Sequence, residues 1–448
     1  MFAEQIMAFS QNLNNLRDFV EMVSSFLDEK SHEEIKDNAE ALLPLMLAMH
    51  KLHPDESDLD EGDISKIEKK IGSGIKVSLI DEDESENGDP IVKGAKFKIE
   101  GDGDKKFSEA MKVLRADHDR KTALYCNSLI SLVSSVEWFL AQLIHKHYKE
   151  NPGIVGSKEK QFSLDELAAF DTVDDAKNYL IEKTVESVLR GSIQDWIEFL
   201  RSKLKLSMGY LDAHKNYIIE VTQRRNLLVH NGGVVNRIYL SNLPRNYDSP
   251  PEIGENIQIS SEYLTKAISI FERCFLLIAA ELWKKVGADN EARGRLLIKL
   301  SYEHLLSERY DISESISLFA ANDKSLQESD QLYAKINYWI SKKYGGGFEE
   351  IKQEIAKEDF SAKSRLFILA KNVLLDDFDE SNKDIEYLLA HDDDFTFNEV
   401  KVWPLFKGFR EQQVYTDLME KHEGSNTGEQ DKMKSEKADK KPTEDVVH

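Results

Sequence analysis

The sequence predicts an all-α protein, and three features of the 448-residue chain indicate this class. Apolar residues recur at helical spacing along most of the chain, and hydrophobic residues make up 41% of it. Charged residues reach 31%, and only nine prolines occur, a composition that favours helices. The chain is too long for one ordinary core. We therefore expect a helical bundle followed by helical repeats, with a small β-hairpin insertion near the N-terminus.

Four regions are expected in order along the chain. They are N-terminal helices with an acidic, partly β or disordered insertion (1–105), a helical bundle (106–288), helical repeats (289–421) and a disordered tail (422–448). The hairpin is predicted from two β-leaning runs, Ile75–Ile80 and Ile91–Ile99, around an acidic loop. The tail is polar and low in complexity, so it cannot bury enough surface to fold alone.

Helix boundaries in the expected bundle follow from capping residues and glycines. Asp171 or Thr172 begins a helix that runs through Leu189, and Ser192 caps the next one. A helix from Tyr210 to about His230 ends at an Asn-Gly-Gly sequence, because Asn and Gly tolerate the left-handed conformation of a C-cap. A last, strongly apolar helix, Ser261–Val286, would close the bundle.

Two sets of apolar residues in the C-terminal half recur every 34 residues. The first set is Leu306, Ile340 and Leu374, and the second is Tyr310, Tyr344 and Phe378. A 34-residue helix-turn-helix period is that of tetratricopeptide units, and three units are the minimum for a stable stack. The alternative is a coincidence among many apolar residues. The two parallel triplets favour the repeat.

Charge and cysteine content limit the classes of function. A net charge of -23 excludes a generic nucleic-acid binder, so any RNA contact must come from a local basic patch. Cys126 and Cys274 lie in apolar runs and are expected to be free, buried thiols in a reducing compartment. The N-terminus lacks the features of a signal peptide, and no apolar run approaches the roughly 20 residues that span a bilayer. We expect a cytoplasmic protein with no membrane contact.

The segment VTQRRNLLVHNGGV, residues 221–234, contains the residues most suited to chemistry. Asn226 and His230 are four apart on a helix and share a face, whereas Arg225 lies about 140° from His230 around the axis. One helix therefore presents Arg225 and His230 imperfectly. A second copy across a two-fold axis would bring two arginines and two histidines into one cleft, so we expect a homodimer.

These side chains suit the cleavage of RNA without a metal. Histidine titrates near neutrality and can move a proton to or from a 2′-hydroxyl or a leaving 5′-oxygen. Arginine can hold a phosphate and stabilise the charge of the transition state, and Asn226 can orient either group. The alternative is that Arg225 and His230 are ordinary residues near a helix C-terminus. No metal-ligand cluster or Gly-rich phosphate loop occurs, so neither a metal nor a cofactor is expected.

The segment from about Ser128 to Leu240 resembles the HEPN family of helical domains. Arg225-Asn226-x3-His230 fits the R-N-x3-H motif of that family, and Glu220, Asn231-Gly232-Gly233 and the upstream SSVEWFL sequence support the resemblance. The resemblance implies a bundle that dimerises to form a composite site. It also implies a metal-independent endoribonuclease that leaves a 2′,3′-cyclic phosphate, with Arg225, Asn226 and His230 as catalytic residues. Many members act as toxins or in antiviral defence, and others are inactive scaffolds.

Further residues are expected to support this site. Between Arg201 and Arg237 seven basic residues stand against two acidic ones, and the residues expected to bind RNA are Lys203, Lys205, Lys215 and Arg237. A solvated helix face is the alternative. Glu137 interrupts an apolar stripe and needs a partner, either Arg224 or Arg225. Glu137, Arg224 and Asn231 are therefore the supporting residues.

Two functions are consistent with the sequence. The first is an HEPN-type endoribonuclease, a toxin or antiviral-defence effector, whose repeats bind a protein partner or an antitoxin. The second is a catalytically inactive scaffold or protein-binding module that acts through the repeats. The intact pair of Arg225 and His230 favours the first.

Overall fold

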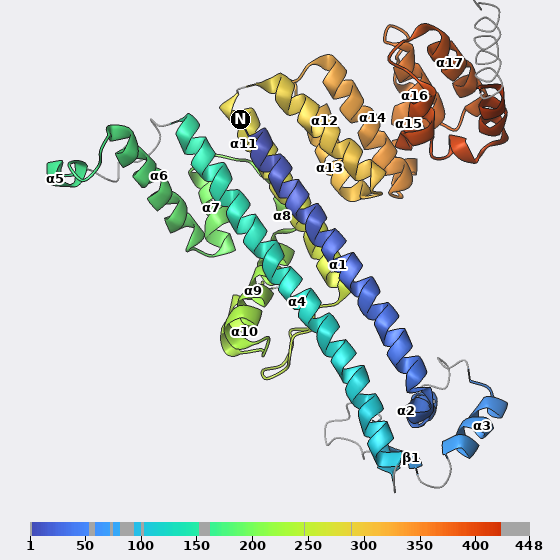
Figure 1. Ribbon diagram of the computed structural model, residues 1–448. Coiled ribbons are helices and arrows are strands. Elements are labelled where there is room, and N and C mark those ends of the chain that lie inside the picture. Colours follow the sequence, from blue (N-terminus) through green and yellow to red (C-terminus); the bar gives the residue numbers. More distant parts are fainter. Residues whose placement is uncertain are drawn as a thin grey trace, which may run out of the picture. The chain divides into compact units, whose positions relative to one another are not determined.

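The computed structural model describes residues 2–52, 59–71, 75–80, 94–99, 103–151, 162–245, 247–287 and 289–422. Nearly all of the described secondary structure is helical, which confirms the all-α class (Figure 1). The expected tail lies outside the described residues, apart from its first residue, His422.

The chain divides into two compact units built from alternating segments. Unit 1 comprises Met1–Ala8, Phe139–Lys215 and Ser269–His448, and unit 2 comprises Phe9–Trp138 and Asn216–Ile268. The division passes through long helices instead of between them. It does not coincide with the expected boundaries at residues 105, 288 and 421, which stay predictions.

Unit 2 is organised around two long antiparallel helices, α1 and α4 (Figure 1). The hydroxyl groups of Ser24 and Tyr125 lie 3.2 Å apart, and Lys121 pairs with Asp28 at 2.7 Å. The elements wholly or partly in this unit are α1 (Ala3–Asp37), α2 (Ala39–Leu52), α3 (Glu61–Ile71), β1 (Ile75–Ile80), β2 (Gly94–Ile99), α4 (Gly103–Glu150), α9 (Lys215–Asn231), α10 (Arg237–Asn242) and α11 (Ser261–Val286).

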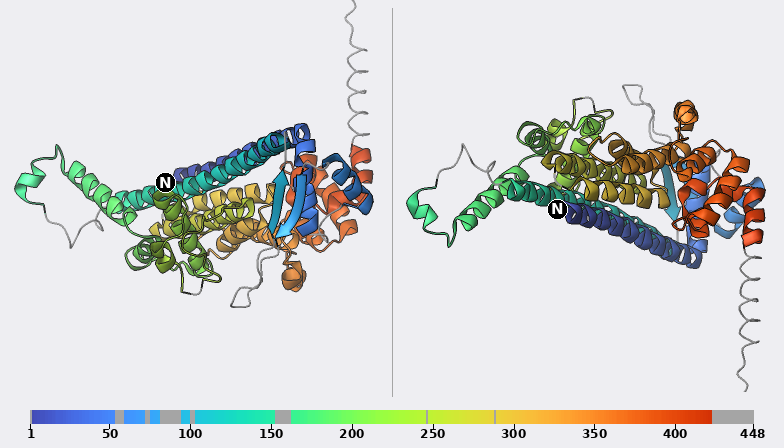
Figure 2. Two further views of the ribbon diagram at one scale, coloured as in Figure 1. Left: turned by 90° about the horizontal axis from the view of Figure 1, so that it is seen from below. Right: turned by 90° about the horizontal axis from the view of Figure 1, so that it is seen from above.

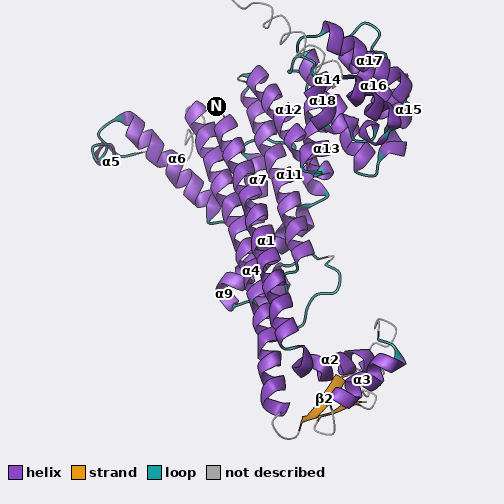
Figure 3. Ribbon diagram, turned by 45° about the vertical axis from the view of Figure 1, so that its right-hand side comes forward, coloured by secondary structure: helices purple, strands orange, loops and turns teal. Residues whose placement is uncertain are grey.

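The two β-leaning runs of the sequence correspond to β1 and the described end of the second run. The strands pair antiparallel, from Ile75 opposite Ile99 to Ile80 opposite Gly94 (Figure 2). They lie beside α2 and α3 within unit 2 (Figure 3). The acidic loop that connects them lies outside the described residues.

α4 corrects one expectation about membranes. Its segment Phe107–Glu150 is long and apolar enough to cross a membrane, judged by length and composition alone. Half of the qualifying 18-residue window is buried inside the protein. The expectation that no apolar run is long enough to span a bilayer is therefore wrong.

Unit 1 contains the described helices between α4 and α9 and those of the C-terminal array. They are α5 (Leu164–Leu167), α6 (Val173–Leu189), α7 (Ile193–Ser202), α8 (Gly209–Asp212), α12 (Asn290–Leu306), α13 (Tyr310–Ala321), α14 (Glu328–Tyr344), α15 (Phe348–Lys357), α16 (Arg365–Leu374), α17 (Phe378–His391) and α18 (Phe397–Val402). The caps of α6 and α7 are as predicted. Thr172 and Ser192 each form a reciprocal capping box with an aspartate three residues later.

The single helix expected from Tyr210 to His230 is wrong, because a turn at Ala213–His214 separates α8 from α9. Glu281 of α11 explains where α8 begins. Its carboxylate accepts hydrogen bonds from the backbone N–H groups of Ser207 and Met208 and from the Tyr210 hydroxyl. A side chain 71–74 residues away in sequence thus anchors the residues where this short helix begins.

The C-terminal array consists of three successive helix pairs, α12–α13, α14–α15 and α16–α17 (Figure 1). Their second helices begin at residues 310, 348 and 378, at intervals of 38 and 30 residues. The helix boundaries therefore do not recur every 34 residues, and the tetratricopeptide-like repeat stays a prediction. The first residue of each second helix is aromatic, and these residues are Tyr310, Phe348 and Phe378.

Both cysteines are free thiols. Cys274 is buried, as expected, and burial raises the pKa of its thiol to about 12. Cys126 is only half-buried, and burial raises its pKa less strongly. A thiol is nucleophilic as its thiolate, so neither cysteine is a candidate nucleophile.

Candidate functional site

The helix α9 carries the motif, and packing on several sides fixes its position. Residues 218–223 are buried, including the acidic Glu220. Further along, Leu227 joins a small core with Val235, Tyr239 and Ile257. Leu228 is half-buried, and Val229 is 49% exposed.

The end of α9 confirms the predicted C-cap. Gly232 and Gly233 have φ angles of 60° and 85°, in the left-handed region that favours glycine. The Gly233 N–H donates to the Leu227 carbonyl at 3.2 Å. Beyond the cap, Val235 exchanges two backbone hydrogen bonds with the segment 254–255, at 2.8 and 2.9 Å. The polypeptide on both sides of His230 is therefore held by backbone interactions.

Arg225 is oriented by two neighbours in unit 2. Its Nη2 donates to Oε2 of Glu137 on α4 at 2.8 Å, and its Nη1 donates to Oδ1 of Asn226 at 3.1 Å. The side chains of Arg225 and Glu137 are 20% and 30% exposed. This resolves the partner of Glu137, which the sequence left open between two arginines. A guanidinium has five N–H donors, so Arg225 keeps donors beyond these two contacts.

The Glu137–Arg225 ion pair is expected to contribute little to stability. Replacing Glu137 with Gln should reduce the free energy of unfolding by at most about 1 kcal/mol, because the pair is partly solvated. Urea unfolding followed by circular dichroism would measure this. A loss of several kcal/mol would contradict an orienting role and assign the pair to the structural core.

His230 lies on the exposed part of α9, one residue before its end. Its side chain makes no hydrogen bond or ion pair with any residue that the structure describes. His230 lies about 7.5 Å from Arg225 along the helix axis, and the two residues are about 140° apart around it. The structure thus brings Arg225, Asn226 and Glu137 together and leaves His230 on the solvent side of the same helix.

Arg224 belongs to a separate, buried polar network. Its Nε donates to Glu220, its Nη1 to the Gln258 carbonyl at 2.9 Å, and its Nη2 to the Tyr247 hydroxyl at 3.2 Å. The guanidinium also lies 4.3 Å from the ring centroid of Tyr263. Arg224 is therefore held by this network, and Glu137 pairs with Arg225 instead. The expected supporting role of Arg224 stays a prediction.

Glu220 is the centre of this network. From the sequence, it only supported the resemblance to the HEPN family. Its side chain is 3% exposed and accepts from the Tyr263 hydroxyl at 2.5 Å and the Tyr247 hydroxyl at 3.4 Å. Burial, and then the Glu220 charge, raises the pKa of both Tyr217 and Tyr263. For Arg224, burial alone would lower the pKa, but Tyr263 and Glu220 raise it above the usual value. The arginine and the tyrosines thus keep their protons.

The remaining predicted residues are divided between the units. Lys203, Lys205 and Lys215 belong to unit 1, and Arg237 belongs to unit 2. Lys203, Lys205 and Arg237 are exposed, and Lys215 is half-buried. Asn231 donates from its side-chain amide to the Val234 carbonyl just beyond the C-cap of α9, and its expected supporting role stays a prediction.

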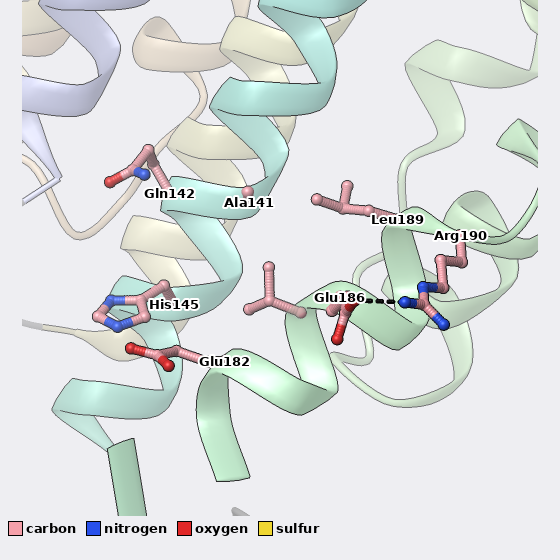
Figure 4. A pocket seen from close by; sticks show the side chains of 8 residues that line it. Ala141, Gln142, His145, Glu182, Glu186, Leu189 and Arg190 are labelled. Atoms are coloured by element: carbon pink, nitrogen blue, oxygen red, sulfur yellow. Dashed lines mark hydrogen bonds and ion pairs between the residues drawn. The ribbon is translucent and has the colours of Figure 1, made fainter. Parts of the chain in front are cut away.

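A hollow lies in unit 1 between α4 and α6 (Figure 4). It has a volume of about 380 Å³, and His145 and Glu182 face it from the two helices. Glu186 pairs with Arg190 at 2.6 Å on the far side. His147 is 5% exposed, and burial together with Lys285 lowers its pKa. His145 faces the hollow and His147 is buried, so these two histidines occupy different faces of α4.

No group of three or more His, Cys, Asp or Glu in the described part of the chain could hold a metal ion. No family model matches the chain, and no curated protein or solved structure matches it either.

Proposed function

We propose that the chain is a metal-independent endoribonuclease of the HEPN type that cleaves RNA at a site shared by two copies. On this proposal it is a cytoplasmic toxin or antiviral-defence effector. Residues 106–288 form its HEPN-like part and residues 289–421 its tetratricopeptide-like repeats. The observation that carries the proposal is how the side chains of two residues on α9 are placed. Arg225 is oriented by Glu137 and Asn226, and the His230 side chain is exposed and makes no hydrogen bond or ion pair with a described residue.

Each side chain has a distinct role in the proposed reaction. The 2′-hydroxyl of the RNA attacks the adjacent phosphate, the bond to the 5′-oxygen breaks, and a 2′,3′-cyclic phosphate forms. His230 moves a proton at one of these oxygens. The N–H groups of Arg225 that remain free stabilise the charge on the phosphate oxygens. Glu137 and Asn226 are positioning residues, since each contacts Arg225.

Exposed apolar residues near the end of α9 support a shared site. Val229 and Ile238 are 49% and 71% exposed, and Ile253 is 58% exposed. Val229 precedes His230, and Ile253 precedes the glycine that hydrogen-bonds to Val235. We infer that these side chains contribute to a surface that another protein covers. A second copy bound there would bring its own Arg225 towards the first copy's His230.

The proposal predicts that cleavage continues without divalent metal. Full-length protein should cut total cellular RNA equally well with and without EDTA, and the products should end in a 2′,3′-cyclic phosphate. Gel electrophoresis measures the first, and mass spectrometry of the fragments measures the second. Cleavage that stops with EDTA would rule out this mechanism. Wild-type and His230→Ala proteins that both leave RNA intact would rule out the activity.

An inactive scaffold that binds a protein through the C-terminal array is the second candidate. One observation favours it: the Arg225 guanidinium already pairs with a carboxylate, which competes with phosphate. For the protein to cleave RNA, Arg225 must bind the phosphate while it stays paired with Glu137. A protein that lacks cleavage but binds a peptide would support the scaffold.

A further inference from the structure

The C-terminal array contains a concave cavity that the ribonuclease proposal does not use. Its volume is about 560 Å³, which is within the usual range for a ligand site. Side chains of α12 and α14 form one side, and the 392–395 connection, Glu399 and Trp403 form the other. All of these residues belong to unit 1. We refer to this space as the repeat cavity.

One wall of the repeat cavity carries three carboxylates. The carboxylates are those of Asp392, Asp394 and Glu399. None of them forms an ion pair with a residue in the described ranges. Burial raises the pKa of Tyr333, and the charges of Asp392 and Asp394 raise it further. These two carboxylates therefore act on a tyrosine ring that also lines the cavity.

The positive charges of the opposite wall are already balanced on their own helix. Arg295 pairs with Glu291 at 2.7 Å, and Lys299 pairs with Glu303 at 3.8 Å. The electrostatic character of the cavity is therefore set by the acidic wall. A polyanion such as RNA is disfavoured there, and a cationic group is favoured.

Two further features select among cationic ligands. Phe395 is buried and Trp403 is half-buried, so the acidic wall borders an apolar surface. Asn337 is only 4% exposed and donates to Ser301 at 2.8 Å, and its amide oxygen has no hydrogen-bond partner among the residues described. An extended peptide offers a backbone N–H to such an oxygen, together with side chains for both walls.

We propose that the repeat cavity binds an extended peptide segment of a partner protein, in which a lysine or arginine stands next to an apolar residue. The basic side chain pairs with Asp392 and Asp394, the apolar one packs against Phe395 and Trp403, and a backbone N–H of the peptide donates to Asn337. This peptide site does not depend on the ribonuclease activity. It specifies the chemistry of the partner that the C-terminal array binds.

The test selects peptides with the full-length protein. A phage library of random 12-residue peptides is panned on wild type, and the most enriched peptide is labelled with fluorescein for polarisation measurements. We expect the enriched sequences to contain Lys or Arg beside an apolar residue. Asp392→Asn/Asp394→Asn should weaken binding about ten- to a hundredfold, because each substitution removes a charge-assisted hydrogen bond. Asp393→Asn is the matched control, since Asp393 is exposed on the same connection and does not line the cavity.

Three results would overturn the proposal. The first is an enriched set without basic residues, and the second is equal weakening by the double variant and the Asp393 control. The third is displacement of the peptide by spermine at an equal concentration, which would assign the cavity to small polycations. His230→Ala should bind the peptide as tightly as wild type. Failure of peptide binding is therefore distinguishable from failure of RNA cleavage.

Discussion

Replacing His230 with alanine is expected to reduce RNA cleavage by about 10²- to 10⁴-fold, because the variant loses the group that moves the proton. The fold should persist, since His230 is exposed and contacts no described residue through a hydrogen bond or ion pair. The initial rate of cleavage of a labelled RNA measures the effect. His118→Ala is the matched control, because His118 is an exposed histidine on α4 in the same unit. Cleavage by His230→Ala at the wild-type rate would remove histidine from the mechanism.

A site shared by two copies also predicts how a mixture of two inactive variants behaves. Arg225→Ala and His230→Ala proteins should each be inactive, but a mixture of the two should recover activity. In a mixed dimer, one site keeps the Arg225 of one copy and the His230 of the other. Random exchange gives half mixed dimers with one intact site each, so about a quarter of the wild-type rate is expected. No recovery, in a mixture shown to exchange subunits, would place both residues of a site on one chain.

The sequence predicted the helix boundaries that depend on neighbouring residues. Thr172 and Ser192 each cap a helix through an aspartate three residues away, and Gly232 ends α9 through its own left-handed φ angle. Each signal and its partner lie within one turn of helix. Local signals of this kind can be recognised without knowledge of the fold.

Boundaries that depend on distant residues were not predictable in the same way. The segment 210–230 contains no Pro or Gly, so nothing local announces the turn at Ala213–His214. The beginning of α8 is fixed by Glu281 from another helix. In the array, the helix pairs differ in length, so a regular spacing of apolar residues did not fix where each helix begins.

The candidate site shows the same limit. The motif identified Arg225, Asn226 and His230, and the apolar stripe around Glu137 indicated that this carboxylate needs a partner. The sequence did not decide between Arg224 and Arg225, because the choice depends on the rotation of α9 against α4. It also left Glu220 unexplained. The tyrosines that bury Glu220, Tyr247 and Tyr263, lie 27 and 43 residues further along the chain.

Replacing Glu220 with glutamine is expected to have the largest effect on stability of any single change in unit 2. The substitution keeps the size of the side chain but leaves the Arg224 charge buried without its carboxylate. Breaking a buried ion pair in this way costs about 3–5 kcal/mol. Hydrogen exchange with mass spectrometry should show this as a loss of amide protection in α9 of roughly a hundred- to several-thousand-fold.

Two further variants separate the buried charge from other causes. Tyr263→Phe removes one hydrogen bond to Glu220 but leaves its charge beside Arg224, so its effect on α9 protection should be intermediate, about 1.5–3 kcal/mol. Glu262→Gln removes an exposed carboxylate on α11 in the same unit, and should change the protection by less than about 1 kcal/mol. If Glu220→Gln and Glu262→Gln behave alike, the network does not hold α9, and the orientation of Arg225 must then depend on its own contacts with Glu137 and Asn226.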